Sequence, residues 1–119
     1  MDTPSELSLT REEWNNWQVI NLKGKFVVKS FNTVRRIFDE IELHANPKVA
    51  VNLSNVSQID SSALTILLNL QKRLKEKNGL AVIIGPNAEI SETFSIVGFS
   101  LAVPVYGSRA AFEKQFSVP

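Results

Sequence analysis

The stretch that decides the fold is VAVNLSNVSQIDSSALTILLNLQKRLKEK, residues 49–77. Residues 49–53 are mostly apolar and β-branched, which is typical of a strand buried on both faces of a sheet. From about residue 61 to 77, apolar side chains recur on one helix face, and Lys and Arg gather in the last turns, where the helix dipole favours positive charge. Residues 54–62 between them are mostly polar. The stretch therefore predicts a buried strand, a loop and a long helix.

The segments after residue 77 repeat the alternation of strand and helix. They are predicted as a strand over 80–84, a helix over 88–97, a short strand over 101–106 and a terminal helix over 108–116. Since right-handed crossovers through helices make successive strands parallel, we expect these strands to share one sheet with helices packed on its faces.

The segments before residue 49 add an antiparallel edge and a further helix. Two short alternating runs, 7–13 and 17–22, predict paired strands, and the asparagines between them tolerate the left-handed backbone of a tight turn. Gly24 is expected to end the second strand, and an apolar stripe predicts a helix over 31–44. The fold class is therefore α/β, with a mixed sheet of four to five strands and about four helices.

Length and composition limit the possible functions. A chain of 119 residues fits one domain over 1–119, with residues 1–6 as a loose N-terminal tip. The absence of Cys excludes thiolate metal sites and cysteine nucleophiles, and one His, His44, excludes sites that need two imidazoles. A net charge of +1 gives no general attraction to nucleic acid. No run of 18 apolar residues and no secretory core is present, so we expect no membrane span and a cytoplasmic location.

The polar triplet Asp60-Ser61-Ser62 stands directly before the long helix. Its plainest interpretation is a helix cap, because Asp and Ser are common caps. A functional interpretation makes one serine a phosphate acceptor, since a helix N-terminus tolerates the negative charge that phosphorylation adds. No phosphate-binding glycine loop occurs, and the sequence indicates no cofactor.

Residues 51–64 resemble the signature of the STAS domain family, which includes anti-sigma factor antagonists and sulphate transporter tails. The family pattern there is a strand, a loop and Asp-Ser-Ser-Gly-Leu opening a helix. Residues 22–26, 78–82 and 94–99 match further family segments in the same order, so the resemblance covers nearly the whole chain from residue 7.

This resemblance implies a non-enzymatic switch. In bacterial antagonists of the family, the second serine is phosphorylated by a partner kinase that is also the anti-sigma factor. The unphosphorylated form binds that kinase, phosphorylation ends the binding, and a phosphatase resets the switch. Carried over, Ser62 is the acceptor, Asp60 caps the helix and shapes the loop, and Ser61 is a cap or a contact. The kinase would supply ATP and magnesium.

Three positions depart from the family pattern near the expected partner face. Ala63 replaces the glycine after the second serine, and Lys25 and Val27 replace a glutamate and an aspartate. Because charge complementarity largely sets specificity, Lys25 and Val27 predict a divergent partner. The expected partner-binding set is therefore Lys25, Val27, Asp60, Ser61, Ser62 and Ala63.

Other interpretations remain open at the level of sequence. The chain could be a STAS scaffold or a subunit of a larger signalling or transport assembly, in which Ser62 serves only as a cap. A small α/β enzyme using Asp60 or Ser62 is disfavoured, since no base, metal set or cofactor loop accompanies them. Trp14 and Trp17 are expected to pack on the edge hairpin or lie at the rim of an interface, and the short edge strand leaves room for a homodimer.

Overall fold

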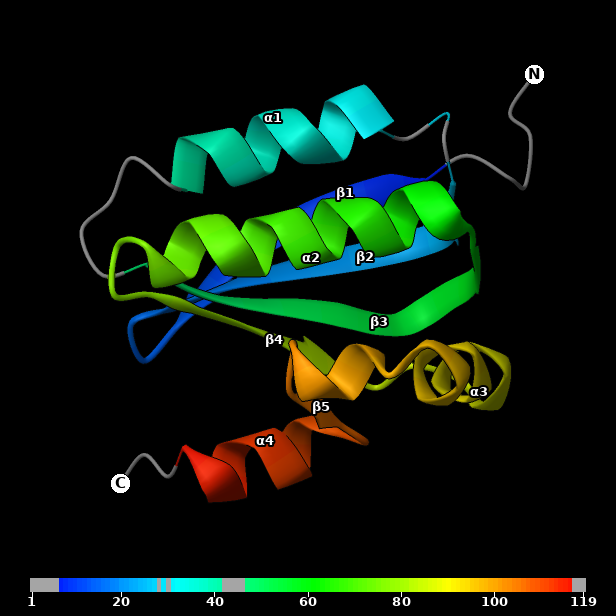
Figure 1. The fold of residues 1–119 in the computed structure, drawn as a ribbon. Coiled ribbons are helices and arrows are strands. Elements are labelled where there is room, and N and C mark those ends of the chain that lie inside the picture. Colours follow the sequence, from blue (N-terminus) through cyan, green and yellow to red (C-terminus); the bar gives the residue numbers. More distant parts are fainter. Residues whose placement is uncertain (1–6, 28, 30, 42–46, 117–119) are drawn as a thin grey trace.

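The computed structural model describes residues 7–27, 29, 31–41 and 47–116 (Figure 1). In chain order the elements are β1 (Ser8–Trp14), β2 (Trp17–Phe26), α1 (Phe31–Ile41), β3 (Lys48–Ile59), α2 (Ser61–Lys75), β4 (Leu80–Ile84), α3 (Ala88–Val97), the 3₁₀ helix η2 (Phe99–Leu101), β5 (Val105–Tyr106) and α4 (Arg109–Gln115). The N-terminal tip, His44 and the end of the helix predicted over 31–44 lie outside the described residues.

The strands form one sheet in the order β1-β2-β3-β4-β5. β1 is antiparallel to β2, whereas β2, β3, β4 and β5 are parallel to one another. Along the chain, α1, α2 and α3 stand between successive parallel strands. The predicted α/β class with a mixed sheet is confirmed.

The hairpin between β1 and β2 turns at Asn15 and Asn16, with φ of 47° and 74°. Positive φ at both central residues is what a two-residue hairpin turn requires, and Asn adopts it more readily than most residues. The predicted turn is confirmed, although β1 runs on to Trp14, which pairs with Trp17.

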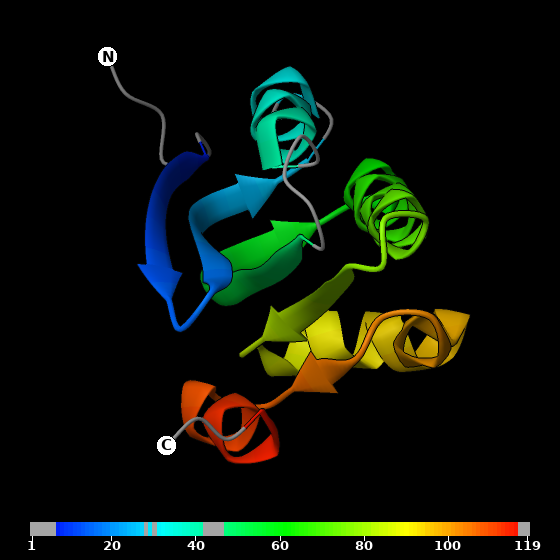
Figure 2. The same ribbon diagram turned by 90° about the vertical axis from the view of Figure 1, so that its left-hand side faces the viewer.

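Helices cover both faces of the sheet (Figure 2). α1, α2 and α3 lie over one face, where Phe38, Leu67 and Phe94 join the larger buried cluster. α4 lies over the other face and contributes Phe112 to the smaller cluster. The smaller cluster also holds Trp17, which is only 3% exposed.

The two Trp side chains pack within the chain. The Trp17 ring lies 5.0 Å from that of Phe112 and 4.9 Å from that of Phe116, measured between centroids. Trp14 lies 5.4 Å from Phe112, and the Arg109 guanidinium stands over its ring at 5.4 Å. The expected packing role of Trp14 and Trp17 is therefore confirmed, and their contacts hold the β1–β2 hairpin against α4.

Two strand boundaries differ from the sequence predictions. β3 continues to Ile59, so the predicted loop over 54–62 shrinks to Asp60, and β2 continues through Gly24 to Phe26. The cause is tertiary, because β2 and β3 pair in parallel as far as Phe26 and Ile59. Register shifts on both sides of Gly24 mark bulges, and its φ of 114° suits a glycine.

The predicted strand over 101–106 is also wrong in its first half. Gly98 ends α3 with φ of 68°, and η2 follows instead of a strand. The Phe99 ring stacks on Phe94 at 4.2 Å, which holds this turn against the core. β5 is left with two residues, Val105 and Tyr106.

A side chain takes the place of the missing part of β5. The carboxamide of Gln71, in α2, accepts a hydrogen bond from Ala81 N at 2.8 Å. Its Nε2 donates to Ala81 O at 2.9 Å and to Ala102 O at 3.1 Å. Gln71 is 3% exposed, so it satisfies buried backbone groups that no strand reaches.

Candidate functional site

Asp60 is the N-cap of α2, as predicted. Its backbone is extended, with φ of −124° and ψ of −175°, and its carboxylate oxygen Oδ1 accepts a hydrogen bond from Ala63 N at 3.1 Å. The Asp60 carbonyl oxygen accepts from the same amide at 3.1 Å and from Leu64 N at 3.3 Å. The Asp60 carboxylate therefore satisfies the Ala63 amide, one of the groups that every helix leaves open at its N-terminus, and the bond from Leu64 is the first regular bond of the helix.

The next three residues differ in exposure. Ser61 is exposed, Ser62 is half-buried, and Ala63 is fully buried. Ser61 does not supply the side-chain cap, which comes from Asp60, but its carbonyl accepts from Thr65 Oγ1 at 3.0 Å. Ala63 belongs to the larger buried cluster, so its methyl group faces the core and is not part of the exposed surface.

The end of β2 lies beside this turn. Lys25 pairs with Gln58, and Phe26 with Ile59, so Val27 and Asp60 each follow the last residue pair of two neighbouring parallel strands. Lys25 and Val27 are both half-buried. The structure thus brings Lys25, Val27 and the predicted 60–63 segment to one end of the sheet.

Two residues that sequence reasoning missed hold this end together. Asn87 caps α3 by accepting from Ile90 N at 2.8 Å, and its Nδ2 donates to the carbonyl oxygens of Val56 at 3.3 Å and Ser57 at 3.4 Å. Ser57 Oγ donates to Gly24 O at 3.3 Å. The cap at Asn87 has a local signal, since it stands directly before a helix; its bonds to β3 have none.

The polar groups at this end of the sheet are the hydroxyls of Ser61 and Ser62, the carboxylate of Asp60 and the ammonium of Lys25. In the parts of the chain that the structure describes, no group of three or more metal-ligating side chains lies together. Within the same parts, none of the helices combines the length and the apolar character that a bilayer crossing requires. The arrangement fits a binding surface that a change of charge can alter.

Similarity to known proteins extends over most of the chain. The family model of the STAS domain matches residues 9–111. A protein of Thermotoga maritima, named as a candidate anti-sigma factor antagonist, is 27% identical over 70 residues, which are 59% of this chain and 62% of that protein. The chain thus spans less than two thirds of the length of the curated relatives it matches.

Solved structures share the fold at low identity. An anti-sigma factor antagonist from Mycobacterium paratuberculosis has a TM-score of 0.81 at 15% identity, covering 92% of this chain and 93% of that one. The unphosphorylated antagonist SpoIIAA has a TM-score of 0.77 at 18% identity, covering 94% and 99%. The phosphorylated form of SpoIIAA, from Bacillus, has a TM-score of 0.69 at 16% identity, covering 91% and 99%. With the mixed sheet, the Asp60 cap and a family match over residues 9–111, the chain belongs to the STAS domain family.

Proposed function

We propose that this chain is a non-enzymatic regulatory protein of the cytoplasm, an anti-sigma factor antagonist switched by phosphorylation of Ser62. Unphosphorylated, it binds a partner that is both anti-sigma factor and serine kinase; phosphorylated, it leaves that partner until a phosphatase resets it. The observation that carries the proposal is the position of Ser62, partly exposed in the first turn of α2 beside the Asp60 cap. The names of the relatives support the class of partner.

The helix end can accept an added anion without loss of the fold. The first turn of α2 contains no acidic residue, and its last turn carries Lys72, Arg73 and Lys75, so its charges follow the helix dipole. A phosphate on Ser62 would face amide groups at the positive end of that dipole. Because Ala63 rather than Ser62 faces the core, the modification would leave the buried cluster intact.

The same phosphate would change the surface that a partner meets. Lys25 and Asp60 carry opposite charges at this end of the sheet, so their sum is close to zero. A phosphoserine adds roughly −1.5 to −2 charges, which makes the surface strongly negative. Like charges across an interface cost several kcal/mol, enough to release a partner that accepts the neutral surface.

Phosphorylation of Ser62 is tested by intact mass. We expect the chain, incubated with ATP and magnesium in lysate of its source cells, to gain the mass of one phosphate group. Ser62→Ala should abolish the gain because it removes the acceptor hydroxyl, and Ser62→Asp should weaken capture of the partner. Ser61→Ala is the matched control and should still be phosphorylated, since it changes only the neighbouring hydroxyl.

The outcomes separate the proposal from its alternative. Phosphate on another residue, or an undiminished gain in Ser62→Ala, would reject Ser62 as the switch. A partner that is captured while no phosphate is ever gained would instead support a scaffold or subunit of a larger assembly, in which the Asp60-Ser61-Ser62 segment only caps α2.

Lys25 and Val27 are proposed to set partner choice. We expect Lys25→Glu, which reverses a charge at the same end of the sheet as Asp60, to weaken binding of the captured partner about tenfold, and less at high salt. Val27→Asp should weaken it too, because it puts a carboxylate where the present partner meets an apolar side chain. Calorimetry or surface binding with the purified partner measures both effects.

A charge reversal at the far end of α2 controls for net charge. Lys75 lies about 20 Å from Ser61 along the helix, at a rise of about 1.5 Å per residue. The Lys75→Glu variant should therefore leave the affinity for the partner unchanged. Unchanged affinity in both Lys25→Glu and Val27→Asp would show that this end of β2 does not contact the partner. Equal weakening by Lys75→Glu would show a general effect of charge.

A further inference from the structure

The turn between α2 and β4 contains the only asparagine in the sequence that is followed by glycine, Asn78-Gly79. This pair is the one most open to spontaneous deamidation, because glycine has no side chain to shield its own backbone nitrogen. The turn lies at the opposite end of α2 from Ser62, where the helix leads into β4 (Figure 1). It is therefore separate from the surface of the proposed function.

Deamidation needs no enzyme, and water is its only co-reactant. The Gly79 nitrogen loses its proton to solvent base and forms a bond to Cγ of Asn78. The bond from Cγ to the side-chain nitrogen breaks, and that nitrogen takes up a proton from water and leaves as ammonia. Water then opens the cyclic imide at either carbonyl carbon. The products are aspartate and isoaspartate, and in isoaspartate the main chain runs through Cβ and Cγ.

The folded turn holds back the first step of this reaction. Gly79 N donates to Leu74 O at 2.7 Å, and Asn78 N donates to Lys75 O at 3.1 Å. Together with the φ of 61° at Asn78, these two bonds make the Schellman motif that ends many helices. The nitrogen that must lose its proton and turn toward Cγ is therefore tied to the helix, although Asn78 itself is exposed.

The same turn has no room for a longer main chain. A Cβ on Gly79 would collide with the carbonyl oxygen of Pro47, so this position requires glycine. That oxygen also accepts from Leu80 N at 2.9 Å, beside the first paired residues of β3 and β4. An isoaspartate adds an atom to the main chain directly before this contact. Gly79 could then no longer fit against Pro47 and reach Leu74 O at the same time.

We propose that Asn78 is a site of spontaneous modification that the fold protects, and that the modified turn cannot close again. The reaction starts only in molecules in which the end of α2 has opened, and its isoaspartate product keeps this end open. Helix ends open locally more often than the core unfolds. This turn is therefore the part of the chain that loses its native structure first as the protein ages.

Incubation of the whole chain in mildly alkaline buffer tests the site and its protection. We expect peptide mapping by mass spectrometry to find acid in place of amide at Asn78 before any other asparagine. The rate should be at least about tenfold lower in the native chain than in the chain unfolded by guanidinium chloride, since reaction from an open state follows the population of that state. Asn78→Gly suits the positive φ and should remove the first acidic species that ion exchange resolves.

Leu74→Ala tests the link between deamidation and opening of the helix end. The Leu74 side chain is fully buried in the last turns of α2, so its truncation favours opening while its carbonyl oxygen remains. Hydrogen exchange of the Gly79 amide and deamidation of Asn78 should both become faster by similar factors, at least about tenfold. Leu101→Ala is the matched control and should change neither rate, since its side chain is 93% exposed.

The isoaspartate form, separated from the aged chain by chromatography, tests the second part of the proposal. It should have a lower urea midpoint than the original chain and an unprotected Gly79 amide. Asn78→Asp has the same charge with a normal main chain, and it should keep the Gly79 amide protected.

Four results would overturn the inference. They are equal rates in the native and unfolded chains, first conversion at another asparagine, faster exchange of Gly79 in Leu74→Ala without faster deamidation, and a protected Gly79 amide in the isoaspartate form.

Discussion

Replacing Phe112 with alanine is expected to lower the free energy of unfolding by about 3–5 kcal/mol, the usual cost of truncating a buried aromatic side chain. Phe112 is 1% exposed, and its ring lies within 6 Å of those of Trp14, Trp17, Tyr106 and Phe116, measured between centroids. These aromatic contacts come from both ends of the chain. Their loss therefore weakens the attachment of α4 as well as the packing beneath it.

Urea unfolding, followed by circular dichroism and by Trp fluorescence, measures this loss. Because Trp14 and Trp17 both contact Phe112, the fluorescence of the folded state should change as well. Leu101→Ala truncates a side chain that is 93% exposed and should change stability by less than about 0.5 kcal/mol. A Phe112→Ala chain as stable as the original would show that α4 contributes little to the fold.

Gln71→Met should cost about 2–4 kcal/mol, although it keeps the length and approximate volume of the side chain. The substitution leaves the Ala81 N–H and the carbonyl oxygens of Ala81 and Ala102 without their hydrogen bonds to the carboxamide. A buried backbone group that loses its partner costs roughly 1–3 kcal/mol. Met also has no donor with which to replace Nε2.

Hydrogen exchange locates the effect. In Gln71→Met, the Ala81 amide should exchange faster than in the original chain by more than the loss of global stability explains. Gln115→Met makes the same substitution at an exposed position of α4 and should be within about 0.5 kcal/mol of the original. Unchanged protection of Ala81 would mean that the backbone groups find other partners.

Sequence reasoning succeeded where the signal is local. The buried strand at 49–53, the helix that begins at Ser61 and the turn at Asn15 and Asn16 each depend on residues close together in the chain. The Asp60 cap is of the same kind, since its hydrogen bond spans three residues. The candidate site was therefore predictable as a helix start carrying two serines.

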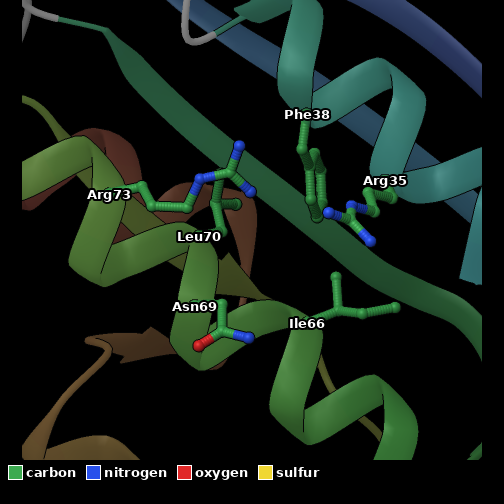
Figure 3. Close-up of a pocket in the computed structure, with 6 residues that line it drawn as sticks. All are labelled: Arg35, Phe38, Ile66, Asn69, Leu70 and Arg73. Atoms are coloured by element: carbon green, nitrogen blue, oxygen red, sulfur yellow. The ribbon is translucent and has the colours of Figure 1, made fainter.

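It failed where a distant segment decides the structure. β2 passes through Gly24 because β3 lies beside it, and β3 reaches Ile59 for the same reason. The burial of Gln71 depends on where β5 begins, and a helix pattern gives no sign of that. The packing of α1 on α2 (Figure 3) depends on two helices whose nearest ends, Ile41 and Ser61, are 20 residues apart in the chain.

The role of Gln71 has a consequence for solubility. Exposed backbone N–H and C=O groups at a sheet edge act as a template on which another chain can add a strand and begin to aggregate. Beyond the two residues of β5, the outer side of β4 at Ala81 would be such a template, and the Gln71 amide occupies it in the manner of a peptide group. One side chain thus closes a stretch of open edge that would otherwise invite association between molecules.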